Sequence, residues 1–279
     1  MSLNQAVEAI PRKSMVLFFL IDTSGSMGGS KIGAVNTAIE EVLPELRDIS
    51  ASNADAEVKI AALEFANAAS WLTANGPVPV ETFNWNYVDA AGNTSMGEAF
   101  FKLNDALSTK TFMQDAVGSY APAIFLLSDG EPTDDFDGGV EELKKNKWFK
   151  ASIKVAVAIG DDANKTRLAE FTGSTESVLE VHSSAMLKKM IKFVSVRASQ
   201  IASQSVQVNP AKPALPSSPT SQNAASLNTA PLSAMSTGSV AAANVVDPTT
   251  DYEESSKQTM LNSELAQARQ QVTAGDDEW

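Results

Sequence analysis

The sequence contains no cysteine and only one histidine, His182, among its 279 residues. Without cysteine, the chain cannot form disulfide bonds, use a thiolate as a nucleophile or bind zinc through sulfur. A single histidine excludes histidine-rich metal sites and leaves few options for a Ser-His-Asp triad. Carboxylates and hydroxyls therefore remain the main candidates for functional groups.

Basic residues and long apolar runs are also scarce. Lysine and arginine number 21 against 34 acidic residues, which gives a net charge of −13. This acidity argues against nucleic acid or an anionic membrane surface as a partner. The apolar run at residues 16–21 is too short for a signal sequence or a membrane span. We therefore expect a cytoplasmic protein without a membrane or nucleic-acid partner.

Short apolar runs alternate with helical patterns along much of the chain. Strands are expected at residues 16–21, 57–65, 123–127, 152–159 and 178–181, with extended pieces near residue 71 and at 80–83. Helices are expected at residues 30–49, 95–108, 138–149, 166–171 and 183–202. Pro44 is expected to kink the first helix or make it restart. This alternation predicts an α/β fold with a mostly parallel central sheet and helices on both faces.

Composition divides the chain into three parts. Residues 1–14 form an N-terminal extension, and residues 15–202 form a domain large enough to bury a full core. Residues 203–279 are rich in Pro, Ser, Ala, Thr and Asn and poor in bulky apolar residues. That composition predicts a disordered tail, with a short helix at residues 253–272.

Candidate metal ligands lie in three separate loops. Asp22, Ser24 and Ser26 form an Asp-x-Ser-x-Ser pattern directly after the first strand. Thr94 lies in a loop before a helix, and Asp129 follows another apolar run. The carboxyl ends of parallel strands meet at one edge of a sheet, and Asp22 and Asp129 are both expected there. Oxygen-only clusters suit a hard cation such as magnesium, although Ser, Asp and Gly are also common turn residues.

These motifs resemble the metal-ion-dependent adhesion site (MIDAS) of von Willebrand factor A (vWA) domains. The resemblance rests on Asp-x-Ser-x-Ser after the first strand, a Gly-x-Thr loop before a helix, and an apolar strand that ends in Ser-Asp-Gly. It covers about residues 12–202 and implies a Rossmann-like fold. The opening Asp-Thr-Ser-Gly-Ser-Met, the pair Val35-Asn36 and residues 126–133 look most similar to the bacterial TerY-like group, which is linked to tellurium resistance.

The resemblance implies a six-coordinate divalent ion, most often Mg²⁺, with Mn²⁺ or Ca²⁺ as other candidates. Ser24, Ser26 and Thr94 would supply hydroxyl oxygens, and Asp22 and Asp129 would bind directly or through water. The sixth position would take an Asp or Glu carboxylate from a partner protein. Neutral hydroxyl ligands would leave the ion electron-poor and receptive to that carboxylate.

One loop departs from the family pattern. It reads Gly92-Asn93-Thr94 where the family more commonly has Gly-Gly-Thr. The change leaves the threonine in place, and Ser95 is an alternative ligand.

The expected function is a non-catalytic, metal-dependent protein-binding adaptor in a bacterial tellurium or stress response. An enzyme would need a general base or nucleophile near the ion, and the metal loops hold no His, Cys or Lys motif for that role. No Walker-type phosphate loop is present, which argues against an ATPase. Two alternatives stay open: a regulatory subunit of a multiprotein enzyme, with an ATPase, kinase or phosphatase as partner, and, less favoured, a metal-dependent hydrolase.

Other polar clusters could have either a functional role or only a structural or solvent-exposed one. The three aspartates at 134, 135 and 137 could hold a second cation, but a solvated acidic loop is favoured. Asp161 and Asp162 are expected in a turn or cap, and His182 in a structural or surface role. Trp85 and Tyr87 could flank the metal and add contact area for a partner. The acidic tail residues 276–278 could block the open coordination position, although a solubilising terminus is the favoured interpretation.

Overall fold

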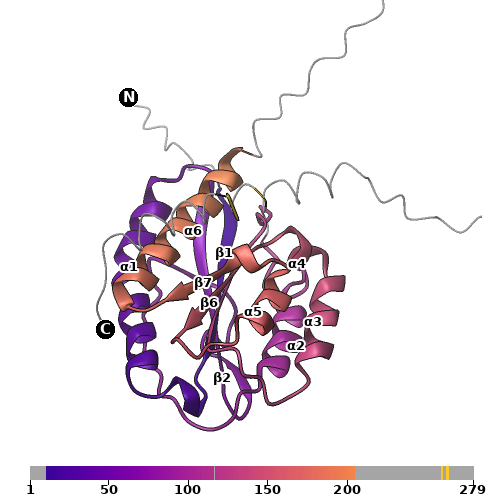
Figure 1. Cartoon of the computed structure of the whole chain (residues 1–279). Helices are drawn as coiled ribbons and strands as arrows, with labels where there is room; N and C mark the ends of the chain where they lie inside the picture. Colours follow the sequence, from indigo (N-terminus) through magenta and orange to yellow (C-terminus); the bar gives the residue numbers. More distant parts are fainter. Residues whose placement is uncertain (1–10, 116, 205–258, 260–261, 264–279) are drawn as a thin grey trace, which may run out of the picture.

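The computed structural model describes residues 11–115, 117–204, 259 and 262–263. Its centre is a seven-stranded sheet in the order β3-β2-β1-β5-β6-β7, with β4 paired to the outer side of β2 (Figure 1). Five strands are parallel, and the two short strands β3 and β4 are antiparallel to β2. The predicted mostly parallel α/β fold is confirmed.

Helices separate the parallel strands from one another, whereas β2, β3 and β4 follow one another directly. The strands are β1 (Lys13–Asp22), β2 (Ala56–Phe65), β3 (Ala69–Trp71), β4 (Val78–Pro79), β5 (Ala123–Ser128), β6 (Ile153–Ile159) and β7 (Val178–Val181). The helices are α1 (Ser30–Ser52), α2 (Met96–Ala106), α3 (Phe136–Lys145), α4 (Lys147–Ala151), α5 (Lys165–Thr172) and α6 (Ser184–Gln204), with short 3₁₀ turns η1 (Gly25–Met27) and η2 (Thr175–Ser177). None of the described helices is both long and apolar enough to cross a bilayer.

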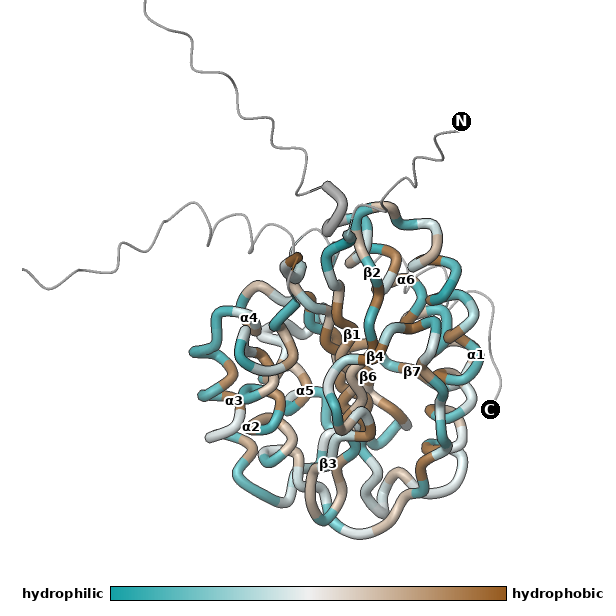
Figure 2. The backbone as a smooth tube through the Cα atoms, turned by 180° about the vertical axis from the view of Figure 1, so that it is seen from behind, coloured by the Kyte–Doolittle hydropathy of each residue, from teal (hydrophilic) through white to brown (hydrophobic). Residues whose placement is uncertain are grey.

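Two hydrophobic layers sandwich the sheet, which explains why its central strands are apolar throughout. Alternate residues of a strand point to opposite faces. On β1, Leu17 and Phe19 therefore pack in the layer under α1 and α6, while Phe18 and Leu20 pack in the layer under α2, α3 and α5. Figure 1 shows the two helix groups on opposite sides of the sheet, and Figure 2 shows the hydrophobic strands between them.

Three details differ from the sequence prediction. Helix α1 runs through Pro44 without a break, because that residue lies on the exposed side and water can bond the carbonyl that it frees. The helix expected at residues 138–149 is two helices separated at Asn146, whose side chain accepts bonds from the Trp148 and Phe149 amides and so starts α4. The extended piece expected at residues 80–83 is β4, which lies two residues earlier.

Candidate metal centre

Two of the predicted ligands come from neighbouring parallel strands. Asp22 is the last residue of β1, and Asp129 directly follows β5. These strands are paired in register, with Ile21 opposite Leu127. Both carboxylates therefore lie at the same edge of the sheet, where ligand sites of open α/β sheets occur. Both are buried, at 0% and 2% exposure respectively.

The Asp22 carboxylate is held at both oxygens. Its Oδ1 accepts a hydrogen bond from the Ser24 amide at 2.9 Å, and its Oδ2 accepts one from Ser128 Oγ at 2.5 Å. Burial raises the pKa of Asp22, against the opposing effect of these hydrogen bonds. The nearby Asp129 charge raises the pKa further. Two buried carboxylates at the ends of neighbouring strands favour a cation between them.

The loop after β1 brings the two serines together. Ser24 Oγ and Ser26 Oγ lie 3.0 Å apart, with Ser24 buried and Ser26 exposed. The Gly25 amide donates to the Gly92 carbonyl at 3.0 Å, which joins this loop to the loop that carries Thr94. Gly92 has a φ of +83°, and a Cβ there would lie 2.5 Å from Asn67 Oδ1, so glycine is required at this contact.

Thr94 is 4% exposed, and Thr133 holds it from the loop after β5. The Thr94 amide donates to Thr133 Oγ1, and the Thr133 amide donates to the Thr94 carbonyl, both at 3.0 Å. The next residue, Asp134, accepts from the Gly97 and Glu98 amides at 2.8 Å each and so caps the start of α2. The backbone that precedes α2 is therefore fastened on both sides of Thr94.

The neighbouring aspartates have structural roles. Besides the Asp134 cap, Asp135 accepts from the Gly138 amide at the start of α3, and Asp137 pairs with Arg167 at 2.8 Å. All three residues are exposed, as predicted, and each is engaged in a specific contact. These contacts favour the interpretation without a second cation.

Asp129 supplies the clearest test of whether this site fits a metal. Its Oδ1 is buried and has no hydrogen-bond partner, and its Oδ2 lies 3.3 Å from Lys31 Nζ. A buried carboxylate oxygen is rarely left without a partner. Asp22, Asp129 and the predicted hydroxyl ligands are all oxygen donors, and such a donor set fits a hard divalent cation. Among the described residues, no group of three His, Cys, Asp or Glu side chains could hold an ion, so a site here would depend on the hydroxyls.

Sequence reasoning assigned no structural role to the residues that organise these ligands. Asn36, buried on α1, donates to the Val88 carbonyl at 2.9 Å and accepts from Trp85 Nε1 and the Val88 amide at 3.1 and 3.0 Å. It thus fastens the segment that leads to Gly92 and Thr94. The sequence feature that could have identified Asn36 is its position as a polar residue on an otherwise apolar helix face. Trp85 is packed against α1, whereas Tyr87 is 59% exposed and donates to Glu40.

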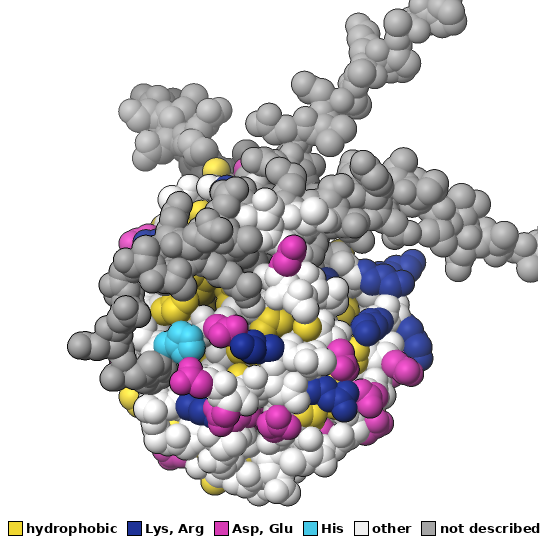
Figure 3. Space-filling model, viewed as in Figure 1, with side chains coloured by type: hydrophobic (Ala, Val, Ile, Leu, Met, Phe, Trp, Pro, Cys, Tyr) yellow, Lys and Arg dark blue, Asp and Glu magenta, His cyan; other side chains and the backbone are white. Residues whose placement is uncertain are grey.

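Lys31 was also missed, although a lysine in the first turn of a helix is disfavoured by the helix dipole and so indicates an acidic neighbour. Its Nζ lies 2.8 Å from Asp162 Oδ1 as well as near Asp129. Partial burial acts to lower the pKa of Lys31, but the bonds to Asp162 and Asp129 outweigh burial and raise it. Asp161 and Asp162 lie in a turn, as predicted, and Asp161 pairs with His182 at 3.1 Å. Figure 3 shows the histidine at the surface beside acidic side chains.

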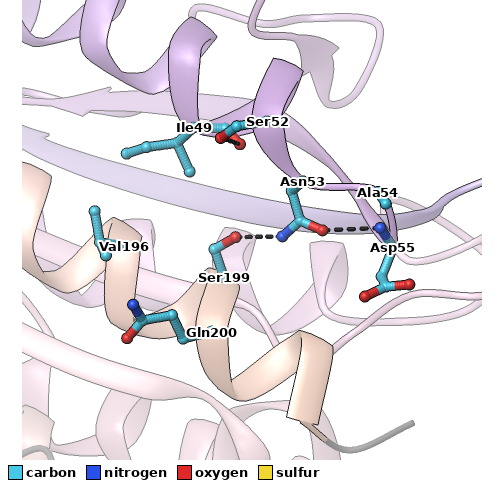
Figure 4. Close-up of a pocket in the computed structure, with 8 residues that line it drawn as sticks. All are labelled: Ile49, Ser52, Asn53, Ala54, Asp55, Val196, Ser199 and Gln200. Carbon is cyan, nitrogen blue, oxygen red and sulfur yellow. Dashed lines mark hydrogen bonds between the residues drawn. The ribbon is translucent and has the colours of Figure 1, made fainter.

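A separate groove of about 610 Å³ lies at the opposite end of the sheet. It is bounded by the last turns of α1 and α6, where Asn53 Nδ2 donates to Ser199 Oγ (Figure 4). None of the candidate metal ligands lines this groove. The candidate metal centre and the groove are therefore distinct features of the domain.

Comparison with known families gives one match that covers most of the domain. The model for the von Willebrand factor type A domain matches residues 17–193, more than half of the chain. A comparison with curated proteins gave no match.

Similar solved structures are longer than the aligned region. A von Willebrand factor type A protein from Catenulispora acidiphila is 16% identical, with a TM-score of 0.49, over 67% of this chain and 43% of that one. The pilus adhesin SpaC from Lactobacillus rhamnosus GG, in an open conformation, is 12% identical, with a TM-score of 0.51, over 68% and 30%. Proximal thread matrix protein 1 from the mussel byssus, with a zinc-occupied MIDAS motif, is 14% identical, with a TM-score of 0.45, over 67% and 46%. This chain therefore spans less than half the length of each, and such identities indicate the fold alone.

Proposed function

The chain belongs to the von Willebrand factor type A family, and from this premise we propose that it is a non-catalytic module that binds a protein partner through a divalent cation. Domains of this family are protein-interaction and adhesion modules. The observation that carries the proposal is the buried Asp129 Oδ1, which has no hydrogen-bond partner beside a second buried carboxylate. A cation would satisfy that oxygen and offset the cost of burying both charges.

The ligands of this cation would be Asp22, Ser24, Ser26, Thr94 and Asp129. Magnesium is the ion that we propose, because it prefers oxygen ligands and retains waters, with Mn²⁺ and Ca²⁺ as alternatives. The bound ion would supply a Lewis-acidic position for a carboxylate from the partner's Asp or Glu. The protein's own contribution is to hold the Asp22 carboxylate in place, through Ser128 Oγ and the Ser24 amide, so that this ligand reorganises little on binding.

The contacts of the neighbouring polar groups support the non-catalytic interpretation. Asp134, Asp135 and Asp137 cap helices or pair with arginine, and His182 pairs with Asp161. None of these groups is left as an evident base beside the ligands. We therefore prefer a binding module to a metal-dependent hydrolase.

The biological setting that we propose comes from the motif resemblance to the TerY-like group. On that basis the module would act in the bacterial cytoplasm, in a tellurium or stress response. Its partner would supply an acidic residue and would be a kinase, a phosphatase or another enzyme that this chain recruits or regulates.

Metal titration of the purified full chain tests the proposal. We expect wild type to bind one Mg²⁺ or Mn²⁺ ion by calorimetry, and Asp129→Asn to lose at least about tenfold in affinity, because a bound carboxylate is replaced by a neutral amide. Asp137→Asn, an exposed substitution in the first turn of α3, is the matched control and should bind as wild type does. Absence of ion binding by wild type, or equal affinity in Asp129→Asn, would contradict the metal site.

The partner is tested separately. A partner retained from the native host in Mg²⁺, and released both by EDTA and by Asp22→Ala, would support metal-dependent capture. A partner retained under all three conditions would bind another face of the domain.

A further inference from the structure

Lys31 places an ammonium group inside the candidate metal centre. Its Nζ lies 3.3 Å from Asp129 Oδ2 and 2.8 Å from Asp162 Oδ1. The lysine side chain is 16% exposed and Asp129 only 3%, whereas Asp162 is 72% exposed. The ammonium therefore bridges a buried carboxylate of the metal centre and a solvated carboxylate outside it.

The backbone at Gly160 leaves room for the Lys31 side chain. A Cβ at Gly160 would lie 2.5 Å from Lys31 Cε and 3.1 Å from Nζ, so the lysine passes directly over a glycine. Gly160 also has a φ of +92°, which favours glycine for a second reason. Residue 31 belongs to the first turn of α1, where the helix dipole disfavours a positive charge and no acidic residue of the same turn offsets it. The two aspartates outside the helix are therefore what stabilises the ammonium in this position.

We propose that Lys31 is a tethered cation that competes with the divalent ion for Asp129, and that Asp162 is the alternative partner that draws the lysine away. This inference rests on the proposed metal-binding function and extends it to the control of ion affinity. The contact to Asp129 is the longer of the two, so it is the one that is more easily given up. A divalent ion on Asp129 would lie close to the ammonium and be repelled by it, whereas Asp162 attracts the ammonium toward solvent.

This arrangement has two consequences of opposite direction. In the absence of the ion, the ammonium partly neutralises Asp129, so the domain tolerates an empty centre without an uncompensated buried charge. When the divalent ion is present, repulsion by the ammonium lowers the affinity of the metal centre for that ion. The site would then exchange its ion in response to the surrounding concentration and not hold it permanently.

The test is a calorimetric titration of the full chain with Mn²⁺, repeated with Mg²⁺. We expect Lys31→Met to raise the affinity about tenfold, which corresponds to the removal of about 1.4 kcal/mol of charge repulsion. Asp162→Asn should lower the affinity severalfold, because the ammonium loses its alternative partner. Lys165→Met, which removes an exposed lysine paired with Glu180, is the matched control and should leave the affinity unchanged.

Thermal unfolding in EDTA provides a readout that does not depend on ion binding. Lys31→Met should melt at a lower temperature than wild type in EDTA and regain more stability than wild type when Mn²⁺ is added. If Lys31→Met proves too unstable to purify, Lys31→Gln and Asp162→Asn carry the same test, with opposite expected shifts in affinity.

The outcomes separate this inference from the proposed function. If wild type binds the ion but Lys31→Met binds it equally or more weakly, the competition is overturned while the metal site stands. If wild type binds no ion under any condition, the proposed function fails, and the inference fails with it.

Discussion

Asp115 shows how a single carboxylate can tie together parts of the chain that are distant in sequence. Its Oδ2 accepts hydrogen bonds from Ser14 Oγ at 2.6 Å and from Lys59 Nζ at 2.9 Å. Burial acts to raise the pKa of Asp115, but the hydrogen bonds from Ser14 and Lys59 outweigh it and lower the pKa to about 2. The residue therefore links β1, β2 and the loop before β5 through its charged form.

The pKa of Asp115 is lower in the folded state than its unfolded value near 3.8, so ionised Asp115 stabilises the fold. This stabilisation is fully present above about pH 4. It is lost as the pH falls from about 4 to about 2. Asp115→Asn should therefore lower the free energy of unfolding by about 1–2 kcal/mol at pH 7, and by progressively less toward pH 2. Urea unfolding at pH 7, 4 and 3 measures this, with the exposed substitution Asp105→Asn as control. An equal effect at pH 7 and pH 3 would contradict an electrostatic role.

The candidate ligands of the metal centre were predictable from the sequence, but the residues that contact those ligands were not. Asp22, Ser24 and Ser26 stand close together in sequence, so their pattern indicates a shared site. Ser128 bonds Asp22 across 106 positions, and Lys31 reaches Asp129 across 98. Contacts of that separation depend on strand order, which a single sequence does not specify at the level of side chains.

At the scale of elements, buried strands were the most predictable parts. Residues 16–21 are apolar at every position because β1 is covered on both faces, and such a run has few other interpretations in a soluble domain. The division between α3 and α4 was not predictable. Asn146 ends one helix and begins the next by bonding the Asn104 and Leu107 carbonyls as well as its own following amides. The position of the break between α3 and α4 therefore depends on contacts with the neighbouring α2.

Helix α2 depends on a cap from a distant loop. Its own N-cap residue, Ser95, makes no side-chain capping bond, and Asp134 supplies two instead. Asp134→Ala should lower the free energy of unfolding by about 1–2 kcal/mol, because two helix amides lose their acceptor. It should also weaken Mn²⁺ binding severalfold, since Thr94 directly precedes this turn.

Asp137→Ala is the matched control for Asp134→Ala. It removes an exposed ion pair with Arg167, and such pairs contribute little. Urea unfolding and Mn²⁺ titration of both variants make the comparison. Equal stability of the two variants would mean that α2 is not stabilised by the Asp134 cap.

At the scale of the whole molecule, the candidate metal ligands and the contact with the C-terminal tail lie at opposite edges of the parallel sheet. The candidate metal ligands lie where β1 and β5 end, whereas the described tail residue Asn262 lies near the start of β7. Ser177 Oγ donates to Asn262 Oδ1 at 2.6 Å, and both residues are buried. Figure 1 shows these described tail residues at the end of the sheet where β1 begins. Most of the predicted disordered tail, including the acidic residues 276–278, lies outside the described residues.

This separation predicts how the tail affects the domain. Removing residues 205–279 should lower the free energy of unfolding by about 1 kcal/mol, because the buried bond between Ser177 and Asn262 is lost. The affinity for Mn²⁺ should stay within about twofold, because a strand of seven residues such as β6 spans about 20 Å between the two edges.

Thermal unfolding and Mn²⁺ titration of the full chain, Asn262→Ala and the chain ending at residue 204 distinguish anchoring from blocking. Anchoring requires that both altered chains lose stability and keep the wild-type ion affinity. Blocking requires that only the shortened chain binds the ion more weakly, because a carboxylate from residues 276–278 would then be one of the ion's ligands. Because Asn262→Ala leaves those acidic residues in place, a fall in affinity confined to the shortened chain would overturn the independence of the two edges and support occlusion of the metal centre by the tail.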